Sequence, residues 1–229
     1  MSKKVLVIAA HPDDEILGCG GTIAKHSSLG DFVQILIVAE GATSRQKNRD
    51  RSQIKDGLSH LKNSAEKASF IVGAKNIEFL DLPDNRLDSL DRLDLIKLIE
   101  EKINSFQPNI IYTHHIGDLN IDHRRIHEAV ITACRPTPQN TISQIFSFEV
   151  ASSTEWQPPS SGICFEPNWF VDISNFLEKK MKALSVYESE MREWPHSRSL
   201  KAIDSLSKWR GAQIGAEAAE AFTLVRSID

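Results

Sequence analysis

Short apolar runs alternate with longer amphipathic segments through the first half of this chain of 229 residues. Continuous runs rich in Val, Ile and Leu are typical of strands buried on both faces of a sheet. We expect four such strands, at residues 5–10, 32–39, 77–80 and 109–112. The segments between them predict helices at residues 16–29, in a stretch that ends near 72–73, and at 90–106. Strands that alternate with helices of this length predict βαβ units, so we expect an α/β fold with a mainly parallel sheet.

The second half of the chain carries weaker signals. A helix is expected to begin near Asp122, and residues 142–150 alternate in the manner of an edge or antiparallel strand. The pattern then predicts a loop at 152–167, a strand at 169–173 and helices at 174–190 and 200–220. Neither a repeat nor a linker divides the sequence, and its length suits one core. We therefore predict a single domain over residues 1–229.

The composition excludes several classes of protein. Lys and Arg number 27 against 31 Asp and Glu, a formal net charge of −4, so the basic excess typical of nucleic-acid or anionic-membrane binding is missing. The three Cys are widely spaced, which argues against a disulfide framework or a cysteine zinc site. The first apolar run is too short for a signal peptide or a membrane span. We expect a soluble, cytoplasmic protein that binds neither nucleic acid nor membrane.

The segment His11-Pro12-Asp13-Asp14-Glu15 directly follows the first predicted strand. In an open α/β sheet, ligands bind at the carboxyl ends of the strands. Three carboxylates crowded there repel one another unless a cation offsets their charge, and His together with Asp suits zinc or another first-row metal. The alternative is a helix N-terminus, where the acids complement the helix dipole, but that alternative gives His11 no role.

Glycines at positions 18, 20 and 21 invite comparison with a dinucleotide-binding loop. Such a loop needs its glycines immediately after the strand, whereas these lie inside the predicted helix. We therefore expect them to allow close packing of that helix on the sheet.

Four of the eight histidines lie between His114 and His127, after the fourth predicted strand. This segment is therefore expected at the same edge of the sheet as the first cluster. One more imidazole from it would complete a set of two His and one carboxylate that leaves positions open for water and substrate. Asp122 is a candidate for orienting a neighbouring imidazole in such a site, or else the N-cap of the helix that begins there.

Together these motifs resemble the LmbE/PIG-L family of metal-dependent N-deacetylases. The resemblance rests on residues 10–15 and on Asp118-x-Asn120-x-Asp122-His123-Arg124, with weaker similarity at residues 82–87 and 190–199. It implies a Rossmann-like three-layer fold and hydrolysis of an acetamido group, usually on an N-acetylglucosamine unit. It also implies a catalytic zinc, with iron(II) or another divalent metal as the alternative. The implied metal ligands are His11, Asp14 and His123, with Asp13 as general base and with Arg45 and Asp84 as sugar contacts.

One departure from the family pattern concerns the general acid. Many members have a His where this chain has Asn120, which donates a hydrogen bond but cannot act as a general acid. We therefore expect Asn120 among the substrate contacts, and His196 as the acid unless it is simply a surface residue. His115 is the second candidate for the acid and a candidate substrate contact. Otherwise Asp13 carries the proton in both steps.

Three arginines bear on the predicted substrate. Planar guanidinium groups suit phosphate or carboxylate, so Arg45, Arg192 and Arg198 indicate an anionic glycoside unless they are solvated surface residues. The predicted function is a metal-dependent hydrolase that removes the acetyl group from an N-acetylglucosamine-type saccharide. Two alternatives stay open: a zinc amidohydrolase acting on a non-sugar amide, and a non-catalytic metal- or nucleotide-binding module. A homo-oligomer is compatible with the sequence.

Overall fold

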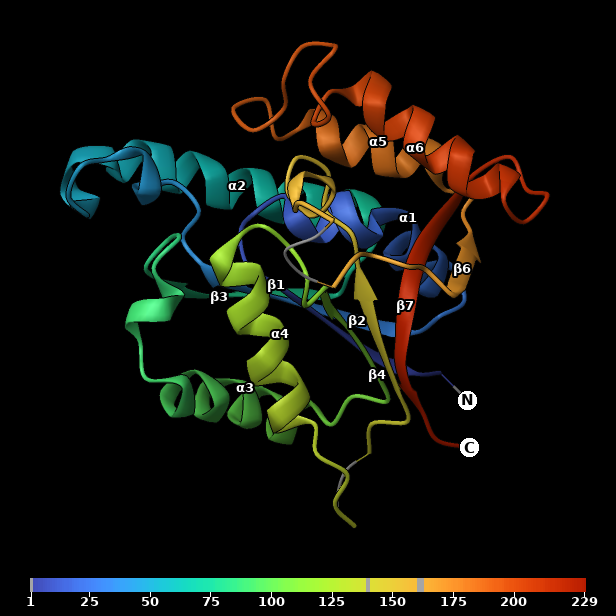
Figure 1. Ribbon diagram of the computed structural model, residues 1–229, viewed down its shortest axis with the longest axis horizontal. Helices are drawn as coiled ribbons and strands as arrows, with labels where there is room; N and C mark the ends of the chain where they lie inside the picture. The colour runs from blue at the N-terminus through green and yellow to red at the C-terminus, as the bar shows by residue number, and fades with distance from the viewer. Residues whose placement is uncertain (1, 139–140, 160–162) are drawn as a thin grey trace.

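One mixed sheet runs through the centre of the computed structural model, which describes residues 2–138, 141–159 and 163–229 (Figure 1). The strand order is β3-β2-β1-β4-β5-β7-β6. Neighbouring strands from β3 to β5 run parallel, whereas β7 runs antiparallel to both β5 and β6. The strands of the described residues are β1 (Lys4–Ala9), β2 (Phe32–Ala39), β3 (Asn76–Leu82), β4 (Ile110–His114), β5 (Gln144–Phe148), β6 (Trp169–Asp172) and β7 (Ala219–Ser227). The predicted α/β fold with a mainly parallel sheet is confirmed.

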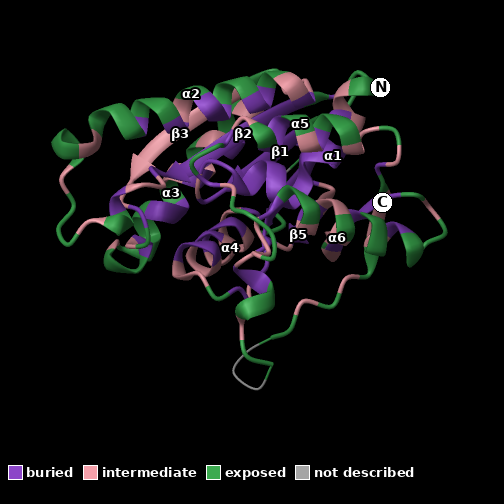
Figure 2. Cartoon of the chain, turned by 90° about the horizontal axis from the view of Figure 1, so that it is seen from above, coloured by how far each residue is buried: buried purple, intermediate pink, exposed green. Residues whose placement is uncertain are grey.

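Helices cover both faces of the sheet, because alternate side chains of a buried strand point to opposite faces. On β1, Val5 and Val7 belong to one apolar core, whereas Leu6 and Ile8 belong to the other. Helices α1, α2, α5 and α6 lie on the first side and α3 and α4 on the second (Figure 1). Their bounds are α1 (Asp14–Ser28), α2 (Lys55–Val72), α3 (Arg92–Phe106), α4 (Ile121–Ala133), α5 (Leu177–Ser185) and α6 (Leu200–Ala212), with short 3-10 helices at Thr43–Arg45, Arg51–Ile54, Leu87–Ser89 and Thr154–Trp156. Figure 2 shows the buried residues concentrated between these layers.

The last third of the chain differs from the prediction. The expected edge or antiparallel strand is the inner strand β5, which pairs parallel with β4 and antiparallel with β7. The helix expected at 200–220 ends at Ala212, and β7 follows from Ala219. The helix expected at 174–190 is the shorter α5. Pairing of β7 with two strands that are distant in sequence, and burial of Phe222 between them, decide its conformation, and local patterning does not report such contacts.

Two glycines let α1 pack closely on its neighbours, as expected. A Cβ atom at Gly18 would overlap the ring of Phe148 in β5, and one at Gly21 would lie 2.7 Å from Ile173. Such separations are far shorter than van der Waals contact between carbon atoms. The glycines therefore bring α1 against β5 and the end of β6.

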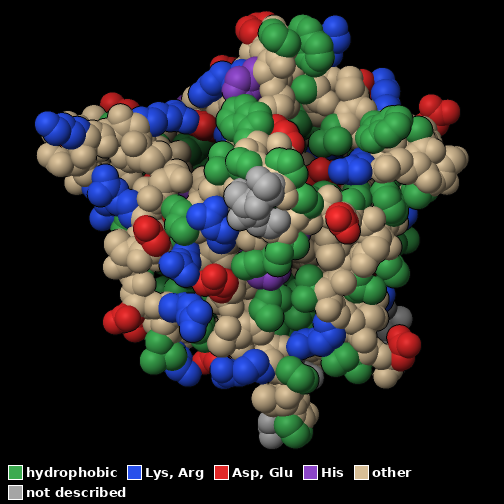
Figure 3. All heavy atoms as spheres, in the orientation of Figure 1, with side chains coloured by type: hydrophobic (Ala, Val, Ile, Leu, Met, Phe, Trp, Pro, Cys, Tyr) green, Lys and Arg blue, Asp and Glu red, His purple; other side chains and the backbone are tan. Residues whose placement is uncertain are grey.

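No helix in the described parts of the chain is long and apolar enough to cross a membrane. On the face shown in Figure 3, acidic and basic side chains are interspersed among uncharged ones. Neither sign of charge therefore dominates that face.

Candidate active site

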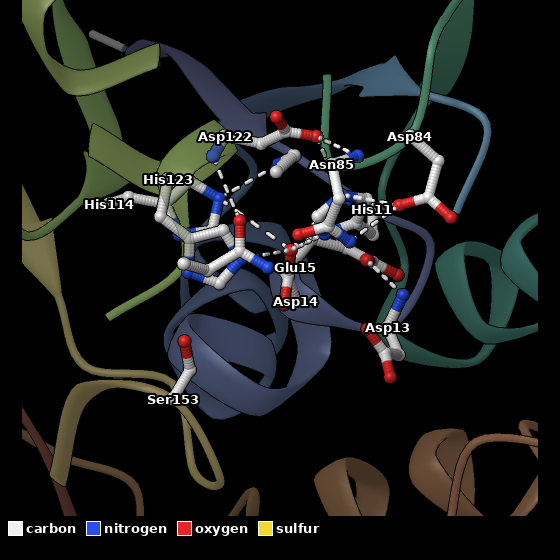
Figure 4. A network of polar contacts seen from close by, with 12 residues as sticks. His11, Asp13, Asp14, Glu15, Asp84, Asn85, His114, Asp122, His123 and Ser153 are labelled. Carbon is white, nitrogen blue, oxygen red and sulfur yellow. Dashed lines mark hydrogen bonds and ion pairs between the residues drawn. The ribbon is translucent and has the colours of Figure 1, made fainter. Parts of the chain in front are cut away.

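The candidate site lies where the order of the strands reverses. From β1 the chain runs outward to β2 and β3, then crosses back to β4 on the other side of β1 and continues outward to β5. In open α/β sheets, the crevice beyond the carboxyl ends of the strands at such a point is the usual ligand site. The segment after β1 and the loop between β4 and α4 meet there (Figure 4). The structure therefore brings the two predicted clusters together.

The three residues predicted as metal ligands lie together: the imidazoles of His11 and His123 both point to one carboxylate oxygen of Asp14. Nδ1 of His11 lies 3.3 Å from Oδ2 of Asp14, and Nε2 of His123 lies 3.1 Å from the same oxygen. Donor atoms around a tetrahedral zinc ion, at bonds of about 2.0–2.1 Å, are about 3.3 Å apart. No metal ion is part of the structure, but the spacing and the donor types fit one.

The other nitrogen of each imidazole faces a second carboxylate. Nε2 of His11 lies 3.1 Å from Oδ2 of Asp122, and Nδ1 of His123 lies 3.1 Å from Oδ1 of Asp118. Carboxylates in this position orient imidazole ligands and increase their basicity. Asp118 is itself held by hydrogen bonds from the hydroxyls of Ser153 and Thr154. The pattern supports His11 and His123 as ligands.

His11, Asp84 and Asp122 form a second group of donor atoms close enough to share a metal ion. Asp122 already accepts hydrogen bonds from the backbone N–H groups of Asn85 (2.6 Å) and Leu87 (3.0 Å). Asp84 accepts one from the N–H of Ser44 (2.8 Å). These bonds suit carboxylates that orient His11, and the N-cap of α4 is Asn120 rather than Asp122.

Without a metal, the imidazoles carry protons that hold the carboxylates together. Burial alone would lower the pKa of His11, but hydrogen bonds to Asp122, Asp14 and Asp84 outweigh it and raise that pKa well above its usual value. Burial likewise opposes charge at His123, but the charges of Asp14 and Asp118 raise its pKa to about 9. A bound dication would take the place of these protons, since metal ligands bind deprotonated.

These shifts predict how the stability of the metal-free protein depends on pH. The pKa of His123 is raised above its value in an unfolded chain, so its contribution is complete below about pH 6.5 and is lost as the pH rises to about 9. We expect the chelated protein to unfold at lower urea concentration at pH 9 than at pH 6. The variant His123→Gln should flatten this dependence, whereas His60→Gln, at an exposed position, should preserve it. Equal stability of the chelated wild type at both pH values would contradict the assignment.

Asp13, the predicted general base, has an unusual backbone conformation. Its φ is +121°, a region that non-glycine residues rarely adopt, and its N–H donates to Oε2 of Glu15 (3.0 Å). Nη1 of Arg198 donates to Oδ2 of Asp13 (2.9 Å). Burial raises the pKa of the Asp13 carboxyl well above its usual value, although the charge of Arg198 opposes the shift. A carboxylate with a raised pKa is a stronger base, so it accepts a proton more readily.

Tyr187 supports Asp13 through Glu15. Its hydroxyl donates to Oε1 of Glu15, and both side chains are fully buried. We expect Tyr187→Phe to lower the free energy of unfolding by about 1–3 kcal/mol, because it removes a partner from a buried acceptor. It should also lower kcat. Without the Tyr187 hydroxyl, the Glu15 carboxylate that accepts the Asp13 N–H is less firmly held.

The matched control is Tyr112→Phe, which removes a buried hydroxyl that contacts His26. Urea unfolding should show a loss of stability in both variants, while kcat should fall only in Tyr187→Phe. An unchanged kcat in Tyr187→Phe would contradict this positioning role.

A polar cavity of about 140 Å³ lies beside these groups. His11, Asp13 and His123 line it. The other predicted site residues in its wall are Arg45, Asp84, Asn120 and Arg198. Nη2 of Arg45 donates to Oε2 of Glu190, another lining residue, over 2.6 Å.

The two candidates for the general acid, His115 and His196, and the predicted substrate contact Arg192 do not line this cavity. Nε2 of His115 lies 3.0 Å from the carbonyl oxygen of Ile163. Nδ1 of His196 accepts a hydrogen bond from the N–H of Arg198 (3.0 Å), and the His196 ring lies against Trp156. Arg192 donates to the carbonyls of Ser189 and Met191 and lines a different depression. The general acid and substrate roles of these residues remain predictions that this arrangement does not favour.

Sequence reasoning missed the roles of Glu190 and Arg198. Both lie in residues 190–199, the segment with weaker similarity to the family. That similarity is the signal in the sequence that points to a role for them. The sequence predicts a substrate contact for Arg198, but the structure pairs it with Asp13. The pairing joins two positions 185 residues apart, so local patterning does not reveal it.

Comparison with known proteins identifies the family. Residues 6–134, more than half of the chain, match the PIG-L family, described as GlcNAc-PI de-N-acetylase. The chain belongs to the PIG-L family. It is 31% identical over 206 residues to diacetylchitobiose deacetylase of Thermococcus kodakarensis, covering 83% of this chain and 71% of that protein. It is 28% identical over 193 residues to the uncharacterized deacetylase YaiS of Escherichia coli, and the match covers 82% of this chain and 91% of that protein.

Solved structures of the same fold superpose on nearly the whole chain. N,N'-diacetylchitobiose deacetylase from Pyrococcus horikoshii, in complex with an inhibitor, has a TM-score of 0.77 at 22% identity and covers 98% of this chain and 84% of its own. GalB, a 4-carboxy-2-hydroxymuconate hydratase from Pseudomonas putida, has a TM-score of 0.75 at 23% identity. The match covers 99% of this chain and 98% of GalB. One fold thus carries two reactions, so the reaction of this PIG-L family member must be argued from its site.

Proposed function

We infer that this chain is a metal-dependent N-deacetylase that hydrolyses the acetamido group of an N-acetylglucosamine-type saccharide. The observation that carries the proposal is the position of Asp13. Its carboxyl group lines the cavity beside the three donor atoms of His11, Asp14 and His123. A purely structural metal site is closed by its ligands and has no use for a spare carboxylate facing a cavity.

The donor set of two imidazoles and one carboxylate favours zinc, and iron(II) or another divalent metal is the alternative. His11, Asp14 and His123 would hold the ion. When bound, the ion supplies polarisation of the amide carbonyl and lowers the pKa of water. One solved structure of similar fold is the zinc-inhibited form of a teicoplanin deacetylase, so the activating metal must be determined by experiment.

The protein groups move the proton. Asp13 accepts a proton from the attacking water, and Arg198 fixes the orientation of its carboxylate. The oxygen of the water forms a bond to the amide carbonyl carbon, and the C–N bond then breaks as the amine takes up the proton that Asp13 held. The carboxylic acid product gives its remaining proton to solvent and leaves as acetate. This assignment makes Asp13 both base and acid, because Asn120 lacks an acidic group and His196 and His115 lie outside the cavity wall.

The relatives support a saccharide substrate. Diacetylchitobiose deacetylase and a probable N-acetyl-alpha-D-glucosaminyl L-malate deacetylase of Bacillus cereus, 24% identical over 91% of this chain, are both named for N-acetylglucosamine compounds. Arg45, Asp84 and Asn120 offer charged and amide groups in the cavity wall to sugar hydroxyls. Cytoplasmic location and self-association remain predictions.

The test is release of acetate together with an equal amount of free amine from N-acetylated saccharides. N-acetylated amino acids serve as non-sugar amides in the same assay. Activity on saccharides supports the proposal. Activity on the amino acid derivatives alone would favour the amidohydrolase alternative, and no acetate from any substrate with metal bound would favour a non-catalytic module.

A further inference from the structure

The two arginines in the cavity wall are already paired with carboxylates. Nη2 of Arg45 lies 2.6 Å from Oε2 of Glu190. Nη1 of Arg198 lies 2.9 Å from Oδ2 of Asp13 and 3.9 Å from the same Glu190 oxygen. The arginine charges that suggested an anionic substrate are therefore neutralised inside the protein.

Glu190 cannot readily give up these partners. The residue is 5% exposed, whereas the side chain of Arg45 is 54% exposed. A substrate anion that drew Arg45 away would leave a buried carboxylate with weaker compensation, which is unfavourable. Arg45 still has N–H groups for sugar hydroxyls, because a guanidinium group carries five donors.

Carboxylates also face any anion placed in the cavity. Asp13, Asp84 and Glu190 all contribute to its wall. A bound dication would not make the site attractive to anions, because three more carboxylates offset its charge. Asp14 would be its ligand, and Asp118 and Asp122 lie against the two ligand imidazoles. Like charges brought together across a binding surface oppose association.

We propose that the cavity selects N-acetylated saccharides that carry no charge next to the reacting sugar, and that Glu190 sets this selectivity. The proposal rests on the proposed function and names its substrate class. Glu190 acts by neutralising Arg45 and by repelling substrate anions. A chito-oligosaccharide fits this class, whereas a sugar joined to a carboxylic acid or a phosphate does not.

The test compares kcat/KM for N,N'-diacetylchitobiose with that for N-acetylglucosaminyl malate. The wild type should prefer the neutral substrate by at least about tenfold, the scale of modest charge repulsion at an interface. Glu190→Gln keeps the shape of the side chain and removes its charge, so it should reduce the preference several-fold. Glu188→Gln, the same change at an exposed neighbouring position, should leave the preference unchanged.

Arg45→Gln tests the pairing from the other side. Because it leaves the charge of Glu190 without its partner, this variant should keep or strengthen the preference for the neutral substrate. A smaller preference in Arg45→Gln than in the wild type would show that Glu190 does not repel anions in this cavity, and the proposal would be wrong. Equal or faster hydrolysis of the malate substrate by the wild type would also overturn it while leaving deacetylation intact. No acetate from either substrate, with metal bound, would overturn the proposed function and this inference together.

Discussion

Replacing Asp13 by Asn is expected to slow acetate release by about 10²–10⁴-fold while the metal content stays unchanged. Asn preserves the size of the side chain and, like Asp, is among the non-glycine residues found most often at positive φ, but its amide cannot serve as a general base. Asp13 is the carboxylate of the first cluster that lines the cavity without belonging to the ligand set. The loss should therefore appear in kcat, measured by acetate release, with bound metal measured on the same sample.

The control for this experiment is Asp88→Asn, because Asp88 is exposed in a 3-10 helix and belongs to neither group of donor atoms. It should retain wild-type kcat and metal content. If Asp13→Asn kept full activity, the general base would have to be another group. If it lost the metal, Asp13 would be a ligand.

Replacing Asp14 by Asn is expected to reduce bound metal from about one ion per chain to nearly none and to reduce activity to background. The Asp14 oxygen is the atom on which both imidazoles converge, at 3.1 Å and 3.3 Å, and a neutral amide oxygen is a far weaker ligand than a carboxylate. Elemental analysis after dialysis against a limited excess of metal measures the effect.

The matched variant is Asp84→Asn, which belongs to the second group of donor atoms with His11 and Asp122. We expect it to keep its metal and to alter KM. Loss of metal from Asp84→Asn with retention by Asp14→Asn would place the ion in the second group instead.

The ligand candidates were predictable because the sequence keeps them near strand ends. His11 and Asp14 follow β1 directly, and His123 follows the loop after β4. Parallel strands place their carboxyl ends at one edge, so residues 112 positions apart in the chain, such as His11 and His123, meet without any knowledge of tertiary contacts. The buried strands were predictable for a similar reason, since their apolar runs are local.

The partners of these residues were not predictable in the same way. The sequence predicts that Asp122 orients a neighbouring imidazole or caps the helix, without indicating which imidazole. The structure places it against His11, where it also accepts hydrogen bonds from backbone N–H groups of the segment after β3. Arg198 and Glu190 come from the segment between α5 and α6, which carries no periodic pattern. Side-chain pairs that cross the fold depend on packing, so they required the structure. The strand β7 was not predicted either, because its conformation depends on pairing with strands that are distant in the sequence.

The most direct test of the account is hydrolysis by one preparation of protein before and after removal of its metal. Chelation and dialysis should abolish acetate release from N,N'-diacetylchitobiose, and stepwise addition of a divalent metal, with zinc, iron(II) and cobalt(II) compared, should restore it up to one equivalent per chain. Addition beyond one equivalent should give no further gain. Full activity in protein shown by elemental analysis to be free of metal would contradict the account.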